Sequence, residues 1–261
     1  MATESVAIIG LEGASPQPGR RRDGFELAIG YSLILLVIWT PRPWQRLLYI
    51  AAAIFLVIVT WRSFESVRAM GLRTANLLRS LWVVIAALLL AAVVLLLAAH
   101  LDTLHRADLN HGAVAFCKRY WGYALWAFAQ QILLQDFFLR RMLRLVSREA
   151  VAVLVAAGIF SLAHLPNPIL TVVTFLWGLI ACTIFLRYRN LYPVGIAHAL
   201  LGITIALSVP GPVIRNMRVG LGYLTYAREH HGRHQEAQRS HADHTVSTRA
   251  WVKAEAPTRR S

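Results

Sequence analysis

The chain alternates between long apolar segments and short polar ones, and this pattern predicts helices that cross a membrane. Inside lipid a helix satisfies its own backbone hydrogen bonds, and no segment alternates residue by residue as a barrel strand does. We therefore expect an all-α fold, a polytopic transmembrane bundle of about seven to eight membrane helices. The expected helices cover residues 25–40, 44–61, 81–101, 118–146, 150–164, 169–186 and 193–209.

Changes in polarity along the chain indicate four regions. Residues 1–23 are rich in Gly, Pro, Ser and Arg and are expected to form a disordered basic tail. Residues 24–118 hold the first three helices and, at 62–80, an arginine-bearing linker that we expect to lie amphipathically at the membrane interface. Residues 119–210 are the expected intramembrane core. Residues 211–261 are a basic, His-rich tail, with a short surface helix expected near its start.

The composition supports the membrane interpretation and reduces the number of plausible binding partners. Hydrophobic residues make up 57% of the chain, charged residues 15%, and the mean hydropathy is +0.51, which is too apolar for a soluble domain. The net charge of +14 comes from arginines that lie mostly between and after the apolar runs. We therefore expect anionic lipid headgroups rather than nucleic acid as the partner of these charges. We expect an integral, multi-pass protein of a bacterial inner membrane. The two cysteines, without a CxxC spacing, predict no disulfide framework.

Three polar groupings interrupt the apolar core at 119–210. They contain Gln135 with Asp136, then His164, then His198. An ionisable side chain at membrane depth is costly, so each grouping is a candidate functional site. The rise of a helix puts Asp136 about 17 Å and His164 about 25 Å from a cytoplasmic turn near Ser147, so the groupings can meet inside the bilayer. One acid and two imidazoles can activate and orient a water molecule.

Other interpretations of the same residues stay open. Asp136 and Arg140 are four residues apart and can form an intrahelical ion pair. Gln131 and Gln135 share another helix face and can hydrogen-bond to neighbouring helices. Each histidine can be an ordinary satisfied interior residue. Histidines also gather around the loop at 102–110 and in the C-terminal tail, where solvated side chains are the preferred interpretation over metal binding.

The stretch from 130 to 205 resembles the CAAX prenyl protease 2 family, which includes bacteriocin-processing intramembrane endopeptidases. That family shows Glu-Glu-x-x-x-Arg, then Phe-x-x-x-His, then His-x-x-x-Asn or Asp. The corresponding residues here are Gln135, Asp136 and Arg140, then Phe160 and His164, then His198 and Gly202. The resemblance implies hydrolysis of a peptide bond in a membrane-embedded or membrane-tethered protein substrate.

The resemblance also implies roles for five residues. Asp136 would be the general base, and Gln135 would position the water. His164 and His198 would bind the water or the oxyanion, and Arg140 would hold Asp136. Because an amide cannot accept a proton at neutral pH, Gln135 cannot replace the family's glutamate base.

The glutamine at position 135, in place of the family's glutamate, leaves three alternatives for the function of the site. Asp136 has taken over as base without a cofactor. Asp136, His164 and His198 hold a divalent metal such as zinc, with a water in an open position. Or the protein is a non-catalytic relative that binds a membrane partner.

Overall fold

The computed structural model describes residues 18–63, 66–74, 76–105 and 112–226, and the regular secondary structure of these residues is helical throughout. This confirms the predicted all-α class. The tail histidines, at 230, 231, 234, 241 and 244, lie outside the described residues. The described elements are α1 (Pro18–Trp39), α2 (Arg42–Arg62), α3 (Leu77–His100), α5 (Gly112–Ile132), η1 (Leu133–Leu139), α6 (Arg140–Leu145), α7 (Glu149–Leu162), α8 (Pro168–Tyr188), α9 (Leu191–Ser208), α10 (Gly211–Ile214) and η2 (Arg215–Met217).

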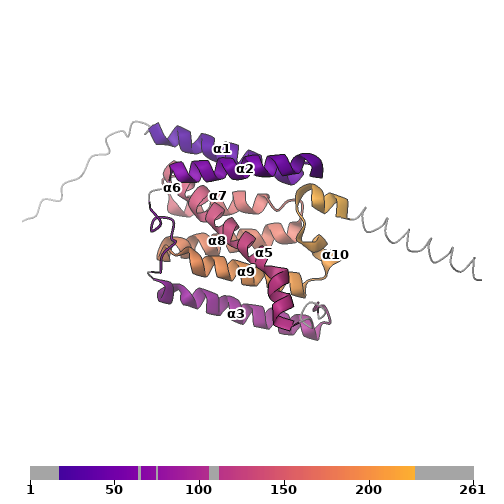
Figure 1. The fold of residues 1–261 in the computed structure, drawn as a ribbon. Coiled ribbons are helices and arrows are strands. Elements are labelled where there is room, and N and C mark those ends of the chain that lie inside the picture. Colours follow the sequence, from indigo (N-terminus) through magenta and orange to yellow (C-terminus); the bar gives the residue numbers. More distant parts are fainter. Residues whose placement is uncertain (1–17, 64–65, 75, 106–111, 227–261) are drawn as a thin grey trace, which may run out of the picture.

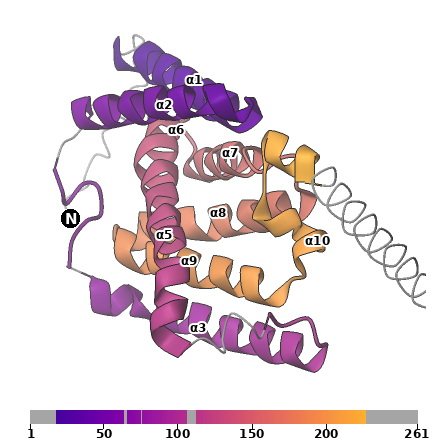
Figure 2. The same cartoon turned by 45° about the vertical axis from the view of Figure 1, so that its right-hand side comes forward.

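Most of the long helices lie side by side in one stack (Figure 1). The hairpin of α1 and α2 forms one edge, α7, α8 and α9 follow in order, and α3 forms the opposite edge. The helix α5 runs obliquely across this stack and packs against α9 (Figure 2). The α1–α2 hairpin contacts the rest of the bundle through α6 and η1. A crossing helix thus connects the two edges of the stack.

Four of the described helices, α2, α3, α8 and α9, are long and apolar enough to cross a membrane. This supports an integral membrane protein. The helix α1 does not meet the same criteria, because five of its first nine residues are charged. The expected number of seven to eight spans therefore stays a prediction.

The proline-rich break at 165–168 is where the sequence places it. Asn167 precedes Pro168 and caps α8, because its side-chain oxygen accepts a hydrogen bond from the Leu170 N–H at 3.2 Å. The same side chain donates to the carbonyls of Ile214, at 2.9 Å, and Arg218, at 3.2 Å. Asn167 thereby fixes the segment after α9 against the start of α8. A further helix covers 220–226, in agreement with the short surface helix expected there.

One expectation near the N-terminus was wrong. Residues 18–23, assigned to the disordered tail, form the first turns of α1. The charge of Asp23 is paired with α6, since Arg144 donates twice to Asp23 at 2.7 Å. The linker expected at 62–80 ends earlier than predicted, because α3 begins at Leu77, and its described residues between α2 and α3 consist mainly of turns. Its position at a membrane interface stays a prediction. Arg73 in this linker donates to the carbonyls that end α8. Long-range polar contacts, which local patterns do not reveal, explain both differences.

The expected helix at 118–146 is a longer run, α5–η1–α6, with a π-helix in its middle. The N–H of Arg140 bonds to the carbonyl of Gln135, five residues back, instead of four. A π-helix has more residues per turn than an α-helix, and such segments are frequent at functional sites. Gln135 and Asp136 both lie within this segment.

Candidate functional site: two histidines over an apolar cavity

His198 lies where α9 approaches α5 most closely. Gly195 and Gly202 flank it at helical spacing, and a Cβ atom on either glycine would collide with α5. The obstacle is the Phe128 ring at Gly195 and the Tyr123 hydroxyl at Gly202. Small residues at these two positions thus allow the helices to touch, and this buries His198 to 7% exposure.

A glutamine relay connects His198 to the π-helix. Gln131 Nε2 lies 2.9 Å from His198 Nδ1, and Gln131 Oε1 accepts from Gln135 Nε2 at 3.2 Å. All three side chains are buried. In the orientation that the structure gives the amide, it donates to Nδ1, and a neutral His198 then carries its hydrogen on Nε2. The imidazole also has a hydrogen-bond interaction with the backbone carbonyl of Ala127. This confirms for Gln131 the prediction of a hydrogen bond to a neighbouring helix, whereas Gln135 bonds to Gln131 in its own helical run.

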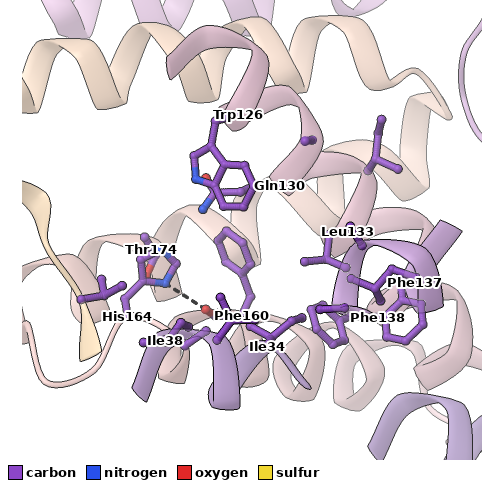
Figure 3. Close-up of a pocket in the computed structure, with 18 of the residues that line it drawn as sticks. Ile34, Ile38, Trp126, Gln130, Leu133, Phe137, Phe138, Phe160, His164 and Thr174 are labelled. Carbon is purple, nitrogen blue, oxygen red and sulfur yellow. Dashed lines mark hydrogen bonds between the residues drawn. The ribbon is translucent and has the colours of Figure 1, made fainter. Parts of the chain in front are cut away.

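His164 has the opposite arrangement of its ring nitrogens. It follows the end of α7, and its Nδ1 donates to the Phe160 carbonyl at 3.0 Å (Figure 3). A neutral His164 therefore has an acceptor lone pair on Nε2. The Phe160 ring packs in T-shaped geometry against both imidazoles, with its centroid 5.2 Å from that of His164 and 6.2 Å from that of His198. One histidine presents an acceptor and the other a donor.

Both histidines line one large cavity of about 970 Å³ between the α1–α2 hairpin and the core. Most of its other walls are apolar, as Figure 3 shows for Ile34, Leu133 and Phe138. Polar groups at the wall are few, and those besides the histidines include Tyr123, Gln130 and Thr174. A cavity of this kind, mostly apolar with a few convergent polar groups, is typical of a ligand or substrate site.

Asp136 and Gln135 do not line this cavity. Asp136 is 4% exposed, and neither of its carboxylate oxygens has a hydrogen-bond partner among the described residues. The cations whose charge reaches it are Arg140 and Arg189, the latter at the turn between α8 and α9. The structure thus connects Gln135 to His198 through Gln131 and brings His164 to the same cavity as His198. It places Asp136 and Arg140 on a different side of the π-helix.

The residues proposed as metal ligands do not fit a metal ion in this arrangement. Among the described residues there is no group of three or more His, Cys, Asp or Glu side chains suited to hold one. Asp136 does not reach the cavity that the histidines share, so the three candidate ligands do not converge on one ion.

Tyr123 is a site residue that sequence reasoning missed, and the partnership of Gln131 with His198 was not foreseen either. Tyr123 and Gln131 lie on α5, whereas Gly202 and His198 lie on α9. Their proximity follows from the crossing of the two helices, which no local pattern encodes. The one sequence feature that pointed to the partnership with His198 was the pair of glutamines, Gln131 and Gln135, four residues apart on an apolar helix.

The fold and the site define a helical membrane protein with one buried and one half-buried histidine at a mostly apolar cavity. Residues 118–204, about a third of the chain, match the family model described as type II CAAX prenyl endopeptidase Rce1-like. This match confirms the resemblance drawn from the three motifs. The matched segment contains the π-helix, both histidines and most of α5. The family is one of membrane proteases. No curated protein and no solved structure matches the chain.

Proposed function

We propose that the protein is an intramembrane endopeptidase that hydrolyses a peptide bond next to the lipid anchor of a membrane-tethered substrate. The observation that carries the proposal is the pair of histidines with opposite hydrogen-bonding roles on one mostly apolar cavity. The match to a family of prenyl endopeptidases supports the reaction class. Because the walls from the α1–α2 hairpin are apolar, the anchor of the substrate would be held there and its peptide would reach the histidines.

In the proposed reaction His164 is the general base. Its Nε2 takes a proton from a water molecule, and the resulting hydroxide attacks the carbonyl carbon of the scissile bond. His198 donates from Nε2 to the carbonyl oxygen as that oxygen becomes negative. The proton on His164 then passes to the leaving amine, which releases two products. General base catalysis contributes about 10²- to 10⁴-fold, and one oxyanion donor about 10²- to 10³-fold.

This assignment differs from the sequence-based expectation that Asp136 is the base. The carboxylate of Asp136 lies off the cavity and near two arginines. We propose that it helps to hold the π-helix and the α8–α9 turn in place. Gln135 acts through Gln131 to orient His198, so Gln135 and Asp136 are both positioning residues.

Cleavage of a panel of lipid-anchored peptides by the purified full chain tests the proposal. We expect His164→Ala and His198→Ala each to lower turnover about 100-fold or more. Asp136→Asn should stay within about tenfold of the wild type, because its charge does not face the cavity. His105→Ala is the matched control, since this histidine bonds to the Leu207 carbonyl at 3.0 Å and does not line the cavity.

The outcomes separate the alternatives. If Asp136→Asn abolishes cleavage and His164→Ala does not, Asp136 is the base, as the sequence suggests. Loss of cleavage on adding a chelator would contradict the metal-free reaction. A wild type that binds the peptides but leaves them intact, together with cleavage by Gln135→Glu, would show that the scaffold has lost its base and serves as a binding protein.

A further inference from the structure

The hydroxyl of Tyr123 fills the space next to Gly202 where any other residue would place its side chain. An ideal Cβ at Gly202 would collide with this hydroxyl and would lie 2.6 Å from Tyr123 Cζ. Gly202 follows His198 by four residues on α9, so the hydroxyl lies about one helical turn from the imidazole along the same face. The glycine therefore makes room for a polar atom beside the proposed site.

Tyr123 is half-buried, and its hydroxyl makes no hydrogen bond with another residue in the described part of the chain. When a ligand displaces water from this hydroxyl, the hydroxyl needs a new partner, because an unpaired polar group away from water is costly. Tyr123 lines the same cavity as His164 and His198. An unpaired donor that borders a substrate cavity is available to a substrate group.

We propose that the Tyr123 hydroxyl is a second donor to the carbonyl oxygen of the bound peptide bond, beside Nε2 of His198, and that Gly202 is required to admit it. The inference rests on the proposed function. Two donors on one oxygen are the usual arrangement for a developing oxyanion, and in a water-poor cavity each has a large effect. The substrate class is accordingly one with an acyl oxygen at the histidines, and Tyr123 contacts it directly as a catalytic residue.

The first test removes the hydroxyl and keeps the ring. Tyr123→Phe should lower kcat about 10- to 1,000-fold, with KM changed much less, because the donor acts mainly on the transition state. The folded fraction and the melting temperature should stay close to those of the wild type. Turnover within about twofold of the wild type would overturn the proposal, since loss of a true donor costs more than that.

A swap of the donor between the two helices separates catalysis from packing. Tyr123→Ala opens the space, and Gly202→Asn added to it places an amide donor there from α9. The matched control adds Gly202→Leu to Tyr123→Ala, since leucine has a similar shape and no donor. We expect the asparagine double variant to cleave at least about tenfold faster than the leucine double variant. Equal rates for two folded double variants would contradict the donor role.

A measurement without turnover keeps this inference separate from the proposed function. The probe is a lipid-anchored peptide with an isotope-labelled carbonyl at the proposed bond, observed by infrared spectroscopy when bound. We expect the carbonyl band to move to higher frequency in Tyr123→Phe, because one hydrogen bond is lost. An unchanged band would overturn the Tyr123 inference. A shifted band with no cleavage by the wild type would refute the proposed function alone, and failure of the wild type to bind the probe would count against both.

Discussion

Replacement of Gln131 by methionine tests whether the glutamine relay sets the hydrogen-bonding state of His198. The Gln131 amide is fully buried and lies 2.9 Å from His198 Nδ1. Methionine has a similar length and flexibility but no donor, so Nδ1 loses its partner and the ring hydrogen is free to sit on either nitrogen. Only the form with hydrogen on Nε2 donates toward the cavity.

The size of the effect follows from the burial of this bond. Leaving a buried polar group without its partner costs about 1–3 kcal/mol, which corresponds to about 5- to 150-fold. Gln131→Met also removes the acceptor for Gln135 Nε2, which is 3.2 Å away. We therefore expect turnover to fall by about 5- to 150-fold, with the loss mainly in kcat.

Initial cleavage rates measure the loss of turnover. Nitrogen NMR of the labelled histidine rings measures which ring nitrogen of His198 carries the hydrogen. The spectrum of the wild type should show hydrogen on Nε2 of His198, and that of Gln131→Met a mixture. Gln45→Met is the matched control, because this glutamine also loses one hydrogen bond, to the Val37 carbonyl at 2.8 Å, but does not line the cavity. If Gln131→Met cleaves as fast as Gln45→Met, the relay does not orient His198 and the reasoning is refuted.

Two further predictions concern stability, both measured by thermal unfolding in detergent. Glu26→Ala leaves the fully buried Arg141 without its carboxylate partner at 2.9 Å and should destabilise the protein by about 3–5 kcal/mol. Adding Arg141→Met should recover much of this loss, and identical melting of the single and double variants would contradict the pairing. Gly195→Ala forces a methyl group into the Phe128 ring and should cost about 1–3 kcal/mol. Gly158→Ala, with nothing within 4 Å of its added Cβ, is the control and should not destabilise; equal losses would contradict the close helix contact.

Long apolar runs were the part of the fold that the sequence predicted well. The expected helix at 44–61 is α2, Arg42–Arg62, and the expected helix at 169–186 is α8, Pro168–Tyr188. Both lie between residues that end a helix, namely prolines or short polar turns. The start of α1 was missed because its polar first turns are held by ion pairs with α6, which is more than a hundred residues away in the chain.

The candidate site was predicted only in part. His164 and His198 were identified as members of one site because each is a polar residue in an apolar helix, and both line the cavity. The side of the helix that Asp136 occupies was not predictable, because residue spacing does not distinguish an α-helix from the π-helix at Leu133–Leu139. Tyr123 was missed because its role depends on a glycine on another helix.

Incorporation of heavy oxygen from water into the product tests the central claim most directly. The wild type is incubated with a lipid-anchored peptide in water enriched in the heavy isotope, and the products are weighed by mass spectrometry, with His164→Gln beside it. We predict that the new carboxyl group gains one heavy oxygen in a single turnover, and that the His164 variant yields almost no product. Intact peptide after incubation with a wild type that binds it, or a cleaved product without the label, would contradict hydrolysis by a water activated between the two histidines.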